Sequence, residues 1–114
     1  MNKFIKASLV AAMLAAPIMA DEEFGGIGVT IYQMRDGVKV AEVIPGTPAA
    51  ETKLQAGDVI TAVDGVSLKG GDIETSKSML RGVVNKPLEI TYISEGETYT
   101  ATLRRAQITV KDIE

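Results

Sequence analysis

The chain has 114 residues, and its 12 Lys and Arg against 15 Asp and Glu give a formal net charge of −3. It contains no histidine and no cysteine, which excludes histidine-based triads, the usual zinc and copper ligand sets and disulfide bonds. The acidic balance and the aromatic content of 4% make nucleic acid and anionic membranes poor partners. We expect neither a metal nor a cofactor.

Residues 1–20 have the pattern of a secretory signal peptide. Lys3 and Lys6 form a positive start, residues 7–16 form an apolar core, and Ala20 stands before an acidic segment. We expect cleavage after Ala20 and a periplasmic or secreted protein. The apolar run is too short for a comfortable membrane span, and an uncleaved anchor is the alternative. Residues 1–20 carry two lysines and no acid, so the charge of −3 becomes −5 without them.

Residues 21–114 are expected to form one small domain. A glycine-rich turn at residues 24–28 leads into a strand over residues 27–34, and an Asp-Gly pair then predicts a hairpin. Thr47 and Pro48 predict the start of a short helix that ends at Gly57. Further strands are expected over residues 38–44, 58–63, 66–68, 88–93 and 98–103.

A second helix is expected over residues 73–81. Asp72 is a suitable N-cap and Gly82 a suitable C-cap for it. The predicted order is therefore β-β-α-β-β-α-β-β. Hairpin-paired strands with two short helices indicate an α+β fold, a partly open antiparallel β-barrel or sandwich of five or six short strands capped by two helices.

Several motifs in this order resemble those of a PDZ domain. They are Gly-Ile-Gly-Val at residues 26–29, Pro-Gly-Thr-Pro-Ala-Ala at 45–50, Leu-Gln-Ala-Gly-Asp-Val-Ile at 54–60, Val-Asp-Gly at 63–65 and Leu-Arg-Gly at 80–82. The chain is most similar to the PDZ domain of secreted bacterial C-terminal processing proteases. The resemblance covers residues 24–105. It implies that a late strand within residues 98–110 completes the sheet, in the circularly permuted bacterial order, before a short extended tail.

The resemblance implies that an extended or C-terminal peptide binds by β-strand addition between the strand after the glycine loop and the second helix. Ile27, Gly28 and Val29 would donate loop N–H groups to a terminal carboxylate, and residues 29–31 would pair with the peptide. The full set of expected peptide-binding residues is Gly26, Ile27, Gly28, Val29, Thr30, Ile31, Ile73, Lys77 and Leu80.

The three helix residues of this set share one face because they are spaced i, i+4 and i+7. Ordinary core packing is the alternative role for Ile73 and Leu80, and a solvated side chain is the alternative for Lys77. If Lys77 faces the groove, it can bury its stem and pair with an acidic ligand side chain.

One departure from the family concerns the residues before the loop. Many PDZ domains carry a basic residue there, whereas this chain has Asp21, Glu22 and Glu23. Their field opposes an anion, although salt screens exposed charges over about 8–10 Å. An internal or hairpin segment is therefore the alternative to a free carboxylate as ligand.

We expect no enzymatic activity from this sequence. The proteases that it resembles use a Ser–Lys pair on a separate domain. The adjacent Ser76, Lys77 and Ser78 cannot replace it, because neighbouring residues point to different helix faces. Asp58 and Asp64 are interpreted as turn residues rather than metal ligands.

The sequence therefore predicts an exported peptide-binding or protein-binding adaptor. One alternative is a regulatory or remnant module of a C-terminal processing serine protease system, with a periplasmic protease as partner. The other is an envelope or secretion-system assembly subunit.

Overall fold

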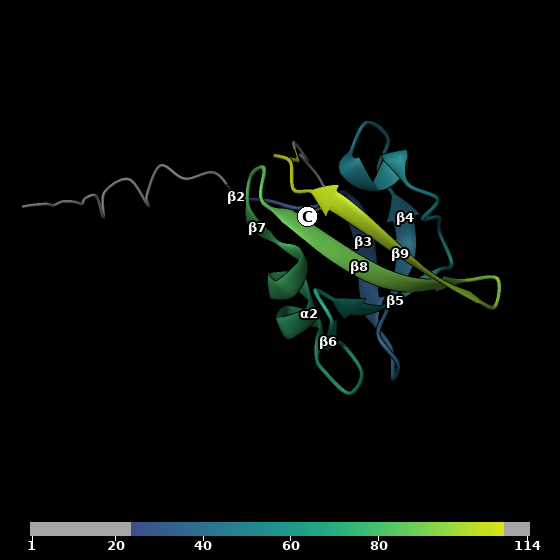
Figure 1. Cartoon of the computed structure of the whole chain (residues 1–114). Coiled ribbons are helices and arrows are strands. Elements are labelled where there is room, and N and C mark those ends of the chain that lie inside the picture. Colours follow the sequence, from purple (N-terminus) through teal and green to yellow (C-terminus); the bar gives the residue numbers. More distant parts are fainter. Residues whose placement is uncertain (1–23, 109–114) are drawn as a thin grey trace, which may run out of the picture.

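The computed structural model describes residues 24–108. The predicted signal peptide and the acidic residues 21–23 lie outside the described residues, as do residues 109–114. A six-stranded antiparallel sheet has the order β3-β4-β5-β8-β9, with β6 paired to β5, and β2 and β7 form a second small sheet. Figure 1 shows α2 beside the curled sheet. No helix within residues 24–108 is long and apolar enough to cross a membrane.

The predicted α+β fold class is confirmed. The elements are β2 (Phe24–Gly25), β3 (Val29–Gln33), β4 (Val38–Val43), the 3-10 helix η1 (Pro48–Glu51), β5 (Val59–Val63), β6 (Val66–Ser67), α2 (Ile73–Leu80), β7 (Gly82–Val83), β8 (Pro87–Ser94) and β9 (Glu97–Arg104). Each predicted strand is present. The expected late strand is β9, which pairs with β8 along its whole length.

The core follows from the alternation of apolar residues along the strands. In β8, Leu88, Ile90 and Tyr92 are buried while Glu89 and Ile93, which point to the other face, are exposed. Burying such a side chain completely contributes about 1.5–3 kcal/mol. The core continues through buried residues of β4, η1, β5, α2 and β9 and of the loops between elements: Ile27, Val38, Val40, Ala49, Leu54, Ile60, Val63, Leu68, Leu80 and Leu103.

The first predicted helix is wrong in type and length. It is a single 3-10 turn, η1, and the chain is extended again at Thr52. The Thr47 hydroxyl donates to the carbonyl of Ile44 at 2.6 Å instead of capping η1. The backbone N–H and the hydroxyl of Thr52 both bond the carbonyl of Ala49, at 3.1 and 2.7 Å. This local side-chain bond competes with helix continuation, so one α-helix, not two, accompanies the sheet within the described residues.

The second helix begins as predicted and ends differently. The Asp72 side chain accepts a hydrogen bond from the backbone N–H of Thr75 at 2.8 Å, and this hydrogen bond lowers the pKa of Asp72. The expected C-cap at Gly82 is wrong, because Arg81 ends the helix in an extended conformation. Gly82 lies in β7, where a Cβ would lie only 2.8 Å from Nε of Arg105. Close packing, not helix termination, requires glycine there.

We predict that Ile60→Ala destabilises the domain strongly. Ile60 is 0% exposed, so its truncation leaves a cavity and lowers the free energy of unfolding by about 2–5 kcal/mol. Ile93→Ala is the matched control, because Ile93 is 38% exposed on the outer face of β8, and it should cost less than about 1 kcal/mol. Urea unfolding curves of both variants measure the difference. Equal losses would contradict this assignment of the core.

Candidate functional site

The outer edge of β3 is unpaired in the sheet of the described residues, because β3 is the first strand in the order. The backbone N–H of Ile44 donates to the carbonyl of Gly28 at 2.8 Å, just before the strand. In an antiparallel ladder, the next residue then has its N–H and C=O turned away from the partner strand. Val29 is that residue, and strand alternation turns Ile31 and Gln33 the same way.

A second observation supports this orientation at the middle of the strand. Ile31 lies opposite Val40 of β4. Val40 uses its N–H on the carbonyl of Asp58 and its carbonyl on the N–H of Gly57, both at 2.8 Å. Because its polar groups face β5, they are not directed at Ile31. The edge of β3 therefore presents the backbone donors and acceptors that an added strand requires.

The glycine loop uses its carbonyls in hydrogen bonds within the domain and leaves two of its N–H groups without a partner among the described residues. The carbonyl of Ile27 accepts from Ala49 N–H at 2.8 Å, while neither Ile27 N–H nor Gly28 N–H bonds another described residue. Gly26 is different, because its N–H and carbonyl both pair with Ala106 at 3.0 Å. Two successive backbone N–H groups without a partner suit an anion as ligand. Gly26 thus anchors the loop, and Ile27 and Gly28 offer the free donors.

The conformation of the loop requires glycine at position 28. Gly28 has φ +95°, a region that side chains other than glycine rarely adopt. A Cβ there would also overlap the side chain of Thr47. By contrast, a Cβ on Gly26 would meet nothing within 4 Å.

The wall opposite β3 is formed by α2. The Ser76 hydroxyl donates to Oε1 of Gln33 at 2.9 Å, and Ser76 is only 1% exposed. This pair was not among the predicted site residues, although Ser76 shares the helix face of Ile73 and Leu80. The bond ties the middle of α2 to the end of β3 and fixes the width of the space between them.

The three predicted helix residues differ in exposure. Leu80 is 4% exposed and belongs to the core, Ile73 is half-buried against the core, and Lys77 is half-buried. The Ser78 hydroxyl donates to the carbonyl of Thr75 at 2.8 Å. Since Ser76 is also engaged elsewhere, neither hydroxyl bonds the lysine. Ile73 and Lys77 are thus the two predicted wall residues with surface left to offer a ligand.

The predicted strand residues also differ. Val29 and Ile31 are half-buried and pack against the core. Thr30 lies between them and its side chain points to the other face of β3. Its Oγ1 is buried without a hydrogen-bond partner among the described residues. Thr30 is therefore part of the edge strand, but its side chain does not contact the groove.

A buried arginine stabilises the end of the wall. Arg105 is 9% exposed, and its Nε and Nη2 donate to the carbonyls of Leu80 and Met79, both at 3.0 Å. These are among the carbonyls that a helix end leaves without partners. Nη1 donates to Pro87 at 3.4 Å. In the sequence this arginine is only the last residue of the region that resembles a PDZ domain, and an arginine after an alternating strand gives no sign of burial.

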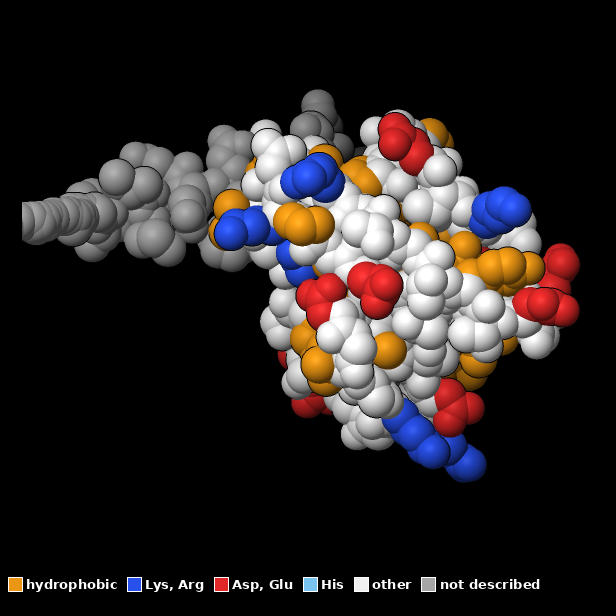
Figure 2. All heavy atoms as spheres, viewed as in Figure 1, with side chains coloured by type: hydrophobic (Ala, Val, Ile, Leu, Met, Phe, Trp, Pro, Cys, Tyr) orange, Lys and Arg blue, Asp and Glu red, His pale blue; other side chains and the backbone are white. Residues whose placement is uncertain are grey.

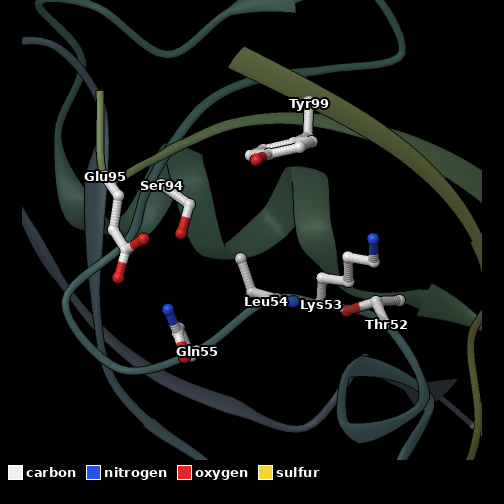
Figure 3. A pocket seen from close by; sticks show the side chains of 7 residues that line it. All are labelled: Thr52, Lys53, Leu54, Gln55, Ser94, Glu95 and Tyr99. Carbon is white, nitrogen blue, oxygen red and sulfur yellow. Dashed lines mark hydrogen bonds between the residues drawn. The ribbon is translucent and has the colours of Figure 1, made fainter. Parts of the chain in front are cut away.

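A separate hollow of about 450 Å³ lies near the β8–β9 hairpin and away from this groove. Its lining is Thr52, Lys53, Leu54, Gln55, Ser94, Glu95 and Tyr99. Figure 3 shows the ring of Tyr99 across the space from Leu54. The lining is mainly polar and carries opposite charges. No sequence motif predicted this hollow.

The described part of the chain has no group of acidic residues placed to hold a metal ion. Oδ2 of Asp58 accepts from Gln55 N–H at 2.9 Å, and Oδ1 of Asp64 accepts from Glu89 N–H at 2.8 Å. Both aspartates therefore have the turn roles that the sequence predicted.

Comparisons with known proteins place this arrangement in a family. The family model described as PDZ domain matches residues 25–104. The carboxy-terminal-processing protease of Bartonella bacilliformis is 33% identical over 69 residues, which are 60% of this chain and 16% of that protein. A probable CtpA-like serine protease of Staphylococcus saprophyticus is 28% identical over 81% of this chain and 19% of its own length. The chain thus spans less than a fifth of these relatives.

Two solved structures have the same fold. The photosystem II D1 C-terminal processing protease has a TM-score of 0.71 and 30% identity over 78% of this chain and 24% of that chain. The PDZ domain of a carboxy-terminal protease from Vibrio cholerae, solved in complex with a peptide, has a TM-score of 0.67 and 21% identity. That match covers 76% of this chain and 98% of that one.

We predict that Gly28→Ala destabilises the domain whereas Gly26→Ala does not. Strain at positive φ and the overlap with Thr47 should lower the free energy of unfolding by about 2 kcal/mol or more. Gly26→Ala places a methyl group in open space and should change it by less than about 1 kcal/mol. Thermal unfolding followed by circular dichroism compares the pair. Similar melting temperatures for the two variants would contradict this description of the loop.

Proposed function

This chain belongs to the PDZ domain family, and we propose that it is a non-catalytic adaptor that binds an extended or C-terminal peptide segment. The peptide adds to the sheet as a further strand along β3. The observation that carries the proposal is the outward orientation of the backbone groups of Val29, Ile31 and Gln33 beside α2. Such an unpaired edge supplies affinity through main-chain bonds, and the neighbouring side chains supply selectivity.

The surroundings of the edge set the properties of the ligand. Its backbone pairs with β3, and its end lies at the free N–H groups of Ile27 and Gly28. Its side chains meet Val29 and Ile31 on one side and Ile73 and Lys77 on the other. A few ordered residues in such a groove give micromolar affinity, about −8 kcal/mol.

The relatives support a link to proteolysis as a second candidate function. The proteins that share this domain are named as C-terminal processing proteases, and the segment they share is a small part of each. In this candidate, the domain delivers a bound C-terminal segment to a separate catalytic chain. Co-purification of the tagged protein with a periplasmic protease would support it.

Export is part of the proposal, because residues 1–20 have the composition of a signal peptide. We predict that the full chain produced in a bacterial host is recovered from the periplasmic fraction. Intact-mass measurement should show a chain that begins at Asp21. An uncleaved chain retained in the membrane fraction would support the anchor instead.

We predict that Ile73→Ala weakens peptide binding by about fivefold, because it removes apolar surface from the helix wall. Ile93→Ala is the matched control, on the outer face of β8, and should leave affinity unchanged. Peptide titrations followed by NMR of the domain measure both, using a library of C-terminal peptides. Shifts are expected at residues 27–31 and along α2.

Two results would contradict the proposal. If no peptide shifts these signals, the domain does not bind peptides in this groove. If the purified domain hydrolyses an unstructured protein and loses this activity on Ser76→Ala or Ser78→Ala substitution, it is an enzyme rather than an adaptor.

A further inference from the structure

Five basic residues lie together at the end of α2 and in the segments beside it. We call Lys77, Arg81, Lys86, Arg104 and Arg105 the basic cluster. Hydrogen bonds hold these segments together: Arg105 N–H donates to the carbonyl of Lys86 at 3.0 Å, and Arg104 Nη1 donates to the carbonyl of Asn85, next to Lys86, at 2.9 Å. Figure 2 shows blue side chains gathered over β7 and the end of β9.

The charges of the domain are unevenly distributed because of the basic cluster. Residues 24–108 contain nine Lys and Arg and ten Asp and Glu, so five of the nine cations lie in the cluster. The remainder of the described domain has four cations against ten acids. Neither residues 75–88 nor residues 98–108 contain an acid. A domain with little net charge therefore has one strongly positive end.

This positive end adjoins the free N–H groups of the glycine loop. Gly82, one residue after Arg81, is paired with Gly25 of β2. Ala106, one residue after Arg105, is bridged to Gly26. The basic cluster thus flanks the loop from two sides, through α2 and through the end of β9.

Arg105 brings a buried charge to this place. Its three side-chain hydrogen bonds all go to backbone carbonyls, so its positive charge is not neutralised by a carboxylate through any of them. A charge in a poorly hydrated site acts more strongly on its neighbours than an exposed one. The nearby loop therefore favours an anion, despite the acidic residues that precede it in sequence.

We propose that the groove selects acidic C-terminal segments: a free α-carboxylate at the loop, with Asp or Glu among the residues just before it. The inference rests on the proposed function and specifies its ligand. The rest of the domain is acidic and repels an extended anionic surface. A short acidic segment that reaches only the positive end is therefore favoured over a membrane.

The test compares peptides that differ only in charge. An acidic C-terminal peptide, its Asn and Gln counterpart and the amidated form of each are titrated at low and at high salt. For the wild-type domain, the acidic free acid should bind about tenfold more tightly than the neutral amide at low salt. Salt should reduce this preference, because the cluster is largely exposed.

Charge-reversal substitutions test which basic residues cause the preference for acidic peptides. Arg81→Glu and Lys86→Glu should each weaken the acidic peptide about threefold to fivefold and the neutral amide less than twofold. Lys53→Glu is the matched control, since Lys53 is an exposed lysine at the separate hollow, and it should have no effect. A peptide with Lys in place of its acids should regain affinity for the Arg81→Glu variant. Circular dichroism confirms that each variant is folded.

The outcomes separate this inference from the proposed function. Equal binding of acidic and neutral peptides, or an effect of Lys53→Glu as large as that of Arg81→Glu, would overturn the inference and leave peptide binding intact. Binding of anionic vesicles that is lost on Arg81→Glu, with unchanged peptide affinity, would also overturn it. If no peptide of either kind binds, the proposed function itself is contradicted.

Discussion

The candidate site depends on the backbone of residues 26–28. Four hydrogen bonds fix this segment: two between Gly26 and Ala106, one from Ala49 N–H to Ile27 and one from Ile44 N–H to Gly28. All the carbonyls of the segment accept hydrogen bonds, whereas the N–H groups of Ile27 and Gly28 bond no other described residue. The same bonds set the register in which β3 begins and therefore decide which of its backbone groups face the open edge.

The groove and the basic cluster are consequences of one arrangement. The chain leaves α2, passes beside β2 and later returns through the end of β9 to pair with Gly26. This path brings the C-terminal end of the helix and Arg105 to the loop. The negative end of a helix normally disfavours an anion, but here the arginine occupies the last carbonyls and adds a positive charge. Fold and electrostatics thus favour the same ligand position.

Local patterns in the sequence were enough to predict most of the fold. The alternation in residues 88–93 and the capping position of Asp72 depend on near neighbours, and the structure confirms both. The helix expected after Pro48 was wrong because Thr52 bonds its own turn and ends it. Gly82 was assigned to a helix cap because its real constraint, contact with Arg105, comes from a distant segment.

The elements of the candidate site could be predicted only in part, because some of its contacts also join segments that are distant in the sequence. The glycine loop and the edge strand could be located from the family motifs, and the structure brings them together with α2. The Ser76–Gln33 bond joins residues 43 positions apart, and the burial of Arg105 depends on the path of the chain after β9. Neither follows from local spacing. The peptide-binding roles of the nine predicted residues remain predictions.

Hydrogen exchange at single amides of β3 tests the central claim most directly. With a saturating peptide, exchange should slow markedly at Val29 and Ile31, whose N–H groups face the open edge. It should change little at Thr30 and Tyr32, whose N–H groups face β4. This alternation is expected only if the ligand adds as a strand. Uniform protection along β3, or protection confined to residues 52–55 and Tyr99 at the separate hollow, would contradict strand addition.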